Sequence, residues 1–200
     1  MSKGLVILLH GVGSSGDDLA GLGDHWARAL PGVSFASPNA PYPFEHGAGW
    51  QWFSLAGITP ENRPARVAEA RAAFDQTLQA ILDRHQMSNS LDKVVLAGFS
   101  QGSIMALDTL VSGRWPVAGI VAFSGRLSSP PPFTPALNTP VLLVHGMADG
   151  VIPVQESEAA EQRLRALGVQ VTSQFEPGIG HTISAQGAQS AMAFIAARLR

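Results

Sequence analysis

A serine at position 100 lies in the pattern Gly-x-Ser-x-Gly over residues 98–102. The preceding run 93–97 is apolar and β-branched like a strand, and 103–110 follows with the apolar spacing of a helix. On so sharp a strand-to-helix turn the serine backbone is strained, and its hydroxyl projects from the sheet at the positive end of a helix. The two glycines let the strand and the helix approach closely. We therefore predict that Ser100 is a nucleophile rather than a solvated turn residue.

A serine nucleophile needs an imidazole to take its proton and a carboxylate to orient that imidazole. For a nucleophile on this kind of turn, the expected chain order is serine, acid, histidine. His181 follows the last predicted strand and is the base we expect, with His46 as its rival. Asp149 follows a later strand and is the acid we expect, although Ala-Asp-Gly is also an ordinary turn sequence.

The other polar candidates have structural explanations. His10 and His145 each end a strand just before a glycine, and we expect them to shape those turns. His25 and His85 lie in or near predicted helices, where histidines are usually surface residues. Asp108 lies within the helix after Ser100 and is poorly placed to reach a histidine.

Acyl transfer also needs backbone N–H groups that bind the oxyanion of the tetrahedral intermediate. Gln101, directly after the nucleophile, provides one by the geometry of the turn. The second is expected from the glycine-rich loop after the first strand, where we choose Val12 and keep Gly11 and Gly13 as alternatives. Phosphate binding by this loop is disfavoured, because it lacks both the Lys-Ser/Thr of a P-loop and the spacing of G-x-G-x-x-G.

Strand and helix patterns alternate along the chain. Strands are predicted at 5–9, 33–36, 93–97, 117–123, 141–144 and 169–175, and helices at 19–30, 63–87, 103–110, 155–167 and from 183 or 184 to 199. This alternation predicts one α/β domain over residues 1–200, with a mostly parallel sheet between two helix layers. The loops that carry the candidate residues should then meet at the carboxyl edge of the sheet.

Composition narrows the function classes. The chain has 200 residues, 46% of them hydrophobic, which fits a sheet buried on both faces. A net charge of −2 leaves no basic field for nucleic acid, and the absence of cysteine excludes disulfides, thiolate catalysis and cysteine-based zinc sites. The apolar run 5–9 is too short to span a membrane and is followed by a glycine-rich loop instead of a cleavage site. We expect a cytoplasmic protein without stable membrane insertion.

A long segment of little regular pattern, 37–62, holds four prolines and a group of aromatic residues. Segments of this length are usually functional or disordered, and the aromatic content argues against disorder. Phe44, Trp50, Trp52 and Phe53 are predicted to line an acyl-binding groove. Coverage of the sheet edge as part of the core is the equally weighted alternative.

Taken together, these motifs resemble the phospholipase/carboxylesterase family of α/β-hydrolases, which includes acyl-protein thioesterases. The matching pieces are residues 9–13, 38–41, 52–53, 98–102, 124–125, 145–153 and 180–181. The resemblance implies a three-layer α/β-hydrolase fold without a separate cap domain, a triad of Ser100, Asp149 and His181, and no cofactor or metal. Val12 matches the usual leucine of the oxyanion loop.

The chain departs from this family at two points. Ser103 stands where a further glycine is usual, and its small side chain is expected to preserve the packing. The chain is also shorter than most members, which leaves the segment 42–55 as the only wall on the acyl side.

We expect a serine carboxylesterase that hydrolyses acyl esters of small to medium chain length through an acyl-enzyme. The nearest alternative is an acyl-thioesterase or a lysophospholipase acting on long acyl chains, because the same residues serve both reactions. A non-catalytic binding module on a hydrolase fold is the alternative of another class. The expected partner is a small-molecule acyl ester, and the resemblance is compatible with a homodimer.

Overall fold

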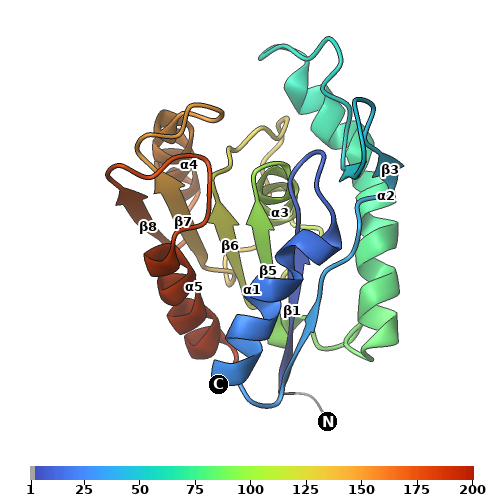
Figure 1. Cartoon of the computed structure of the whole chain (residues 1–200), viewed down its shortest axis with the longest axis vertical. Helices are drawn as coiled ribbons and strands as arrows, with labels where there is room; N and C mark the ends of the chain where they lie inside the picture. The colour runs from blue at the N-terminus through green and yellow to red at the C-terminus, as the bar shows by residue number, and fades with distance from the viewer. Residues whose placement is uncertain (1–2) are drawn as a thin grey trace.

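The apolar strands predicted from the sequence form one parallel sheet, seen in Figure 1 with its carboxyl ends upward. The computed structural model describes residues 3–200. The strand order is β2-β1-β5-β6-β7-β8, and each neighbouring pair is parallel. These strands are β1 (Gly4–Leu9), β2 (Val33–Ala36), β5 (Val94–Phe99), β6 (Gly119–Phe123), β7 (Val141–Gly146) and β8 (Val171–Glu176). The predicted α/β fold with a mostly parallel sheet is confirmed.

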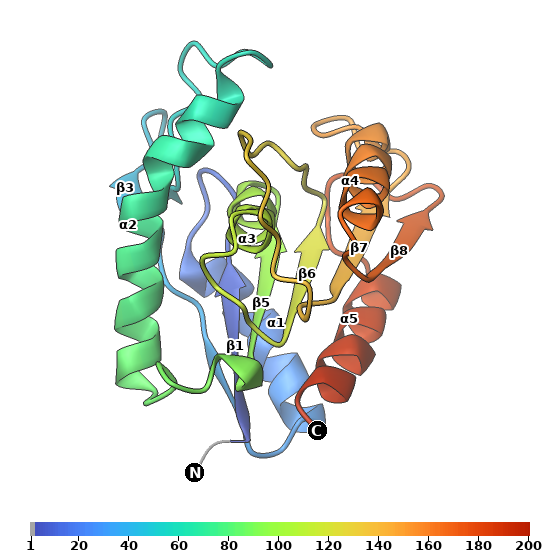
Figure 2. The ribbon, with the colours of Figure 1, turned by 180° about the vertical axis from the view of Figure 1, so that it is seen from behind.

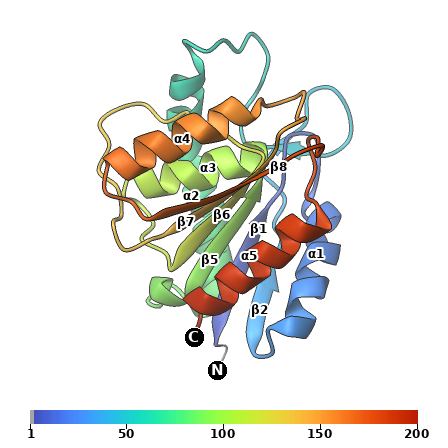
Figure 3. The same cartoon turned by 90° about the vertical axis from the view of Figure 1, so that its left-hand side faces the viewer.

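Helices cover both faces of this sheet (Figures 2 and 3). On one face lie α1 (Gly16–Ala29) and α5 (Ala185–Arg198), and on the other α2 (Arg63–Arg84), α3 (Gln101–Val111) and α4 (Val154–Ala166). A short 3₁₀ turn, η1 (Leu91–Lys93), leads into β5. No helix in the described part of the chain is long and apolar enough to cross a bilayer.

Side chains of β1 divide the core between the two helix layers. Leu5, Ile7 and Leu9 pack in the cluster under α2, α3 and α4, whereas Val6 and Leu8 pack in the cluster under α1 and α5. The strands β1, β5, β6 and β7 therefore bury both of their faces, because successive side chains point to opposite sides of a sheet. This is why these four strands are unbroken apolar runs, whereas the edge strand β8 is partly exposed and contains polar residues.

The segment 37–62 is more regular than we predicted. It contains an antiparallel pair, β3 (Tyr42–Pro43) and β4 (Trp50–Gln51). The loop after β1 supports β4, because Gly13 N–H donates to the Trp50 carbonyl and Trp50 N–H donates to the Ser14 carbonyl. The prediction of an irregular segment was wrong here, since strands of two residues carry no periodic signal.

The backbones of α3 and of the end of β1 approach each other closely. A Cβ atom on Gly102 would overlap the carbonyl of Leu9, and one on Gly98 would crowd the first turn of α3. The strand and the helix can therefore meet only where both positions are glycine.

Gly102→Ala is expected to lower the free energy of unfolding by about 3 kcal/mol, because backbone atoms must shift to admit the methyl group. Gly21→Ala is the matched control. Gly21 lies within α1 and has open space where its Cβ would stand, so alanine should stabilise the protein by about 1 kcal/mol. Urea unfolding of both variants measures the difference, and equal stability of the two would contradict the packing argument.

Candidate active site

Ser100 occupies the sharp turn between β5 and α3. Its φ and ψ are 56° and −115°, so this non-glycine residue has a positive φ, as the pattern predicted. The turn is held on both sides, because Ser100 N–H donates to the Phe123 carbonyl at 2.9 Å and the Ser100 carbonyl accepts from Ile104 N–H at 3.1 Å. The surrounding packing thus maintains a backbone conformation that costs about 1–3 kcal/mol elsewhere.

A chain of hydrogen bonds runs from this serine to an aspartate. Ser100 Oγ lies 3.1 Å from Nε2 of His181, and Nδ1 of His181 lies 2.7 Å from Oδ2 of Asp149. The Asp149 carboxylate fixes the imidazole tautomer, since a carboxylate oxygen accepts and Nδ1 must then carry the proton. Nε2 is left as an acceptor that faces the serine hydroxyl. The loops after β5, β7 and β8 bring these residues together at the carboxyl edge of the sheet.

Asp149 is buried but well supplied with donors. Oδ1 accepts from the N–H groups of Val151 and Ile152, at 2.8 and 2.9 Å. Burial raises the pKa of Asp149, but the hydrogen bonds from His181 and the two backbone N–H groups outweigh burial and leave this pKa below its usual value. The residue is therefore an anion beside the imidazole at neutral pH.

Two neighbours of these residues were not assigned to the site from the sequence. The Phe99 ring lies 4.9 Å from the His181 ring, and Nε2 of His145 lies 3.2 Å from Oδ2 of Asp149. His145 also shapes its turn, as predicted, because Nε2 lies 2.7 Å from the Ile152 carbonyl. The signal available was its position at a strand end, four residues before Asp149.

The loop after β1 lies beside Ser100, where a Cβ on Gly11 would stand 3.3 Å from that of Ser100. Gly13 N–H is already used by the Trp50 carbonyl, which removes it from the alternatives for an oxyanion donor. Within residues 3–200, neither Val12 N–H nor Gln101 N–H donates to another protein group. These two N–H groups are free to bind a ligand oxygen.

His10 holds this loop as a neutral imidazole. Its Nδ1 donates to the Gly11 carbonyl at 2.7 Å, and its Nε2 accepts from Ala40 N–H at 2.8 Å. Burial lowers the pKa of His10, although the bond to Gly11 and the charge of Asp18 raise it. Burial is thus the main reason for the low pKa, because the charged imidazolium would lose its hydration inside the protein.

The side chain of Gln101 joins the turn at Ser100 to the aromatic segment. Its Oε1 accepts from Trp52 N–H at 2.7 Å, and its Nε2 donates to the Phe53 carbonyl at 2.8 Å. Trp52 in turn donates from Nε1 to the His10 carbonyl at 2.8 Å. Residues 52–53 are therefore hydrogen-bonded to Gln101, whose backbone N–H is free, and to His10, which leads into the loop that carries the free N–H of Val12.

The four aromatic residues that were predicted to line an acyl-binding groove lie in different parts of the structure. Trp52 and Phe53 are buried, and Trp52 packs against His10 and Phe74 in the core. Both also line a cavity of about 690 Å³ between α2 and the segment 42–56. Phe44 lies over Gly13 instead, and Trp50 packs on the edge of the core.

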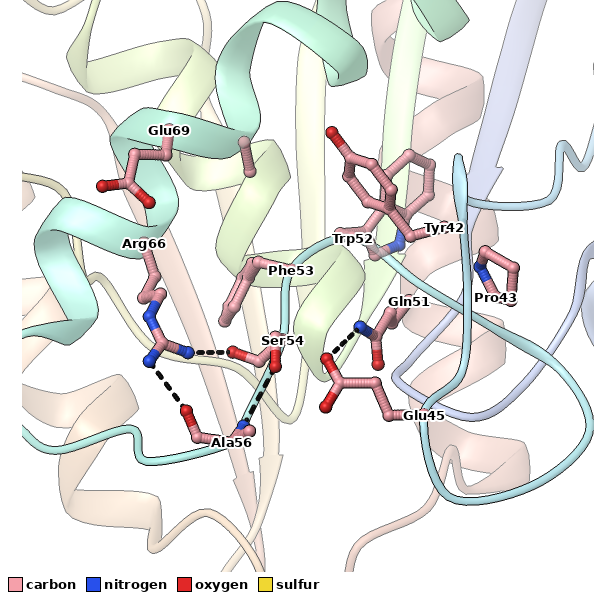
Figure 4. A pocket seen from close by; sticks show the side chains of 11 residues that line it. Tyr42, Pro43, Glu45, Gln51, Trp52, Phe53, Ser54, Ala56, Arg66 and Glu69 are labelled. Carbon is pink, nitrogen blue, oxygen red and sulfur yellow. Dashed lines mark hydrogen bonds between the residues drawn. The ribbon is translucent and has the colours of Figure 1, made fainter.

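Figure 4 shows this cavity, with Arg66 projecting from α2 toward the segment that follows Phe53 and with Glu69 one turn further along α2. The Arg66 guanidinium donates to the carbonyls of Ser54 and Ala56, both at 2.7 Å. The remaining lining residues are Tyr42, Pro43, Glu45, Gln51, Trp52 and Ala70. The cavity thus combines an aromatic wall with a charged rim.

The rival candidates lie elsewhere. His46 lies in the loop between β3 and β4, with its ring 5.7 Å from Phe44. Asp108 is buried in ion pairs with Arg71 and Arg114, at 2.7 and 2.9 Å. In the described range 3–200, no three histidine, aspartate or glutamate side chains gather as metal ligands would.

Comparison with known proteins places these features in context. The sequence profile described as Phospholipase/Carboxylesterase matches residues 1–199. The chain is 33% identical to Esterase YpfH of Escherichia coli over 94% of its length and 80% of that protein. It is 28% identical to Acyl-protein thioesterase 1 of Neurospora crassa, over 97% and 86% of the two chains. The crystal structure of esterase PE8 is 35% identical, with a TM-score of 0.84 and coverage of 98% and 93%.

The low pKa of His10 makes stability depend on pH. Below about pH 6.5 the unfolded chain binds a proton at His10 that the folded chain does not, so the free energy of unfolding falls as the pH falls. His10→Gln retains an acceptor for Ala40 N–H and removes this titration. Urea unfolding at pH 7.5 and 5.5 should show a smaller loss of stability in the variant, and an equal loss in both proteins would contradict the assignment.

Proposed function

Since this chain belongs to the phospholipase/carboxylesterase family of α/β-hydrolases and is a carboxylic ester hydrolase, we propose that it is a serine esterase that forms an acyl-enzyme on Ser100. The observation that carries the proposal is the hydrogen-bond chain from Ser100 Oγ through His181 to Asp149, at 3.1 and 2.7 Å. Small- to medium-chain acyl esters are the proposed substrates.

In the first half of the proposed reaction, Ser100 Oγ forms a bond to the acyl carbonyl carbon while Nε2 of His181 takes the hydroxyl proton. Asp149 stabilises the imidazolium that results. The oxyanion is bound by the N–H groups of Val12 and Gln101, each worth about 10²–10³ in rate. The bond to the leaving oxygen then breaks, and His181 returns its proton to the alcohol.

In the second half, a water molecule takes the place of the alcohol. His181 accepts a proton from this water while the water oxygen attacks the acyl carbon of the ester on Ser100. The same N–H groups bind the second oxyanion. Collapse of this intermediate releases the carboxylic acid, and the proton on His181 returns to Ser100 Oγ.

The preference for shorter acyl chains rests on the cavity beside Trp52 and Phe53. Its volume of about 690 Å³ is within the range of small-molecule sites. Burial of each CH₂ against the aromatic wall contributes roughly 0.8 kcal/mol. A long chain would reach the charged rim at Arg66 and Glu69, where further CH₂ groups gain little. A cytoplasmic location and a homodimer stay predictions from the sequence.

Thioester hydrolysis is the second candidate, favoured by the likeness to Acyl-protein thioesterase 1 of Neurospora crassa. A thiolate is a better leaving group than an alkoxide, so the same residues would serve. Values of kcat/KM for an oxyester and a thioester with the same acyl group separate the two functions.

Hydrolysis of nitrophenyl esters from acetate to palmitate is expected to be fastest for the shorter chains. Ser100→Ala should lower kcat/KM by about 10³-fold or more, and Asp149→Asn by about 10⁴-fold, since the amide no longer selects the imidazole tautomer. Wild-type protein should also be labelled by a serine-directed phosphonate, whereas Ser100→Ala should not. Absence of both labelling and hydrolysis would favour a binding module, and a preference for palmitate would favour the long-chain alternative.

The low pKa of Asp149 predicts the form of the pH profile. Between pH 5 and 7 this carboxylate stays ionised, so its own protonation does not add a second proton to the loss of activity as the pH falls. The logarithm of kcat/KM should therefore rise with pH at a slope that approaches one on the acid side. A slope of two would show that Asp149 titrates in the same range, and a flat profile from pH 5 to 8 would exclude His181 as the base.

A further inference from the structure

The loop that carries His181 is closed by a pair of polar side chains. Glu176, the last residue of β8, is buried, and Ser184 Oγ donates to its carboxylate, at 2.9 Å from Oε1 and 2.8 Å from Oε2. Ser184 is the N-cap of α5, so this bond joins the two ends of the segment 177–183. We propose that Glu176 is a positioning residue, which holds His181 against Ser100 through its bond to Ser184. This inference rests on the proposed function and adds a residue to it.

Backbone hydrogen bonds anchor this segment on one side of His181. Ahead of the histidine, Ala148 N–H donates to the Ile179 carbonyl at 2.9 Å, which joins the segment to the loop after β7. Over residues 180–183, the one backbone hydrogen bond in the described part of the chain lies within the segment itself. The backbone therefore leaves the side of the loop that follows His181 without a bond to another element.

Apolar contacts accompany the second half of the loop but do not give it a direction. The Phe99 ring lies 4.9 Å from the His181 ring, and Ile183 is partly buried against the core cluster under α1 and α5. Hydrophobic contacts of this kind are non-directional. Within residues 3–200, the Ser184 hydroxyl makes the first hydrogen bond after His181 that reaches another element. It is therefore the contact that fixes where the imidazole stands.

The carboxylate of Glu176 is built into the start of α5. Gly187 N–H donates to Ser184 Oγ at 2.8 Å, so one hydroxyl both caps the helix and donates to Glu176. A Cβ on Gly187 would stand 3.3 Å from Glu176 Oε1, so the glycine leaves the space that the carboxylate occupies. Gln174 Nε2 donates to Oε2 at 3.2 Å. The end of β8 and the start of α5 are thus held together, three residues beyond the histidine.

Two substitutions of Glu176 separate the acceptor from the space that its side chain fills. Methionine has a similar length and no oxygen, whereas glutamine keeps one acceptor oxygen for the Ser184 hydroxyl. Glu176→Met should lower kcat for a nitrophenyl ester by about 10- to 100-fold, as for a displaced reacting group. Glu176→Gln should retain kcat within about threefold. KM should change by less than about twofold in both, because Glu176 does not touch the substrate.

Thermal unfolding of the same variants separates positioning from stability. An apolar side chain in place of a buried polar one of similar shape is close to neutral, and the partly exposed Ser184 hydroxyl can bond to water instead. Glu176→Met should therefore unfold at a Tm within about 3 °C of the wild type. A loss of kcat without a matching loss of Tm is the result expected for a positioning residue.

Ser184→Ala removes the donor and leaves the carboxylate in place. It also removes the cap of α5, so its Tm should fall by several degrees, unlike that of Glu176→Met. Its kcat should fall as in Glu176→Met, and the double variant should lose no more than either alone, because all three lack the same bond. Ser184→Ala also decides the matter where Glu176→Met does not fold.

Thr139→Val is the matched control. Thr139 is buried and donates to the Val117 carbonyl, and both residues precede their strands at the amino edge of the sheet. The substitution removes a buried hydroxyl far from the loop of His181. It should therefore leave kcat unchanged.

Proton nuclear magnetic resonance examines the variants without substrate. The His181 Nδ1 proton, held against Asp149, should give a downfield signal in the wild type and Glu176→Gln and a broadened or absent signal in Glu176→Met. Wild-type protein that cleaves no ester would contradict the proposed function, and this signal would still test Glu176. Equal kcat and equal signals in folded Glu176→Met and wild type would overturn the positioning role.

Discussion

The close approach of three backbone segments at Gly102 is the constraint on which the site depends. The end of β5, the start of α3 and the Leu9 carbonyl at the end of β1 meet where no Cβ atom fits. Because α3 is buried along its whole length, its packing offsets the strain of a positive φ at Ser100. The loop after β1 is consequently placed beside the serine, so the Ser100 hydroxyl and the free N–H groups of Val12 and Gln101 share one structural cause.

The remaining part of the site depends on bonds between loops rather than on regular elements. β7 and β8 end next to each other, and their parallel pairing extends as far as Gly146 and Glu176. Beyond that pair the backbone bonds continue, with Met147 and Ala148 donating into the next loop. Asp149 and His181 thus lie on two loops that behave as an extension of the sheet, which explains how irregular segments hold a hydrogen bond of 2.7 Å.

The alternation of strands and helices was predictable from the sequence, as were the turn at Ser100 and the places of Asp149 and His181, because short local patterns encode each of them. The antiparallel pair at 42–51 and the contact of His145 with Asp149 were not. The hydrogen bond from Trp52 N–H to the side chain of Gln101, which was not predictable either, joins residues 49 positions apart. Periodicity indicates which face of an element is buried, but it does not identify the partner that a polar side chain finds across the fold.

Core packing and a substrate groove were treated as alternatives for the aromatic segment, yet Trp52 and Phe53 both belong to the core and both line the cavity. Trp52 packs on His10 and Phe74, and it also lines the cavity in Figure 4. A smaller side chain there would enlarge the cavity, create a void in the core and remove the donor to the His10 carbonyl. The shape of the cavity and the stability of the fold are therefore coupled at Trp52. The exposed Glu69, on the opposite side of the cavity, is a position where the cavity can be altered with little loss of stability, because its side chain supports no core contact.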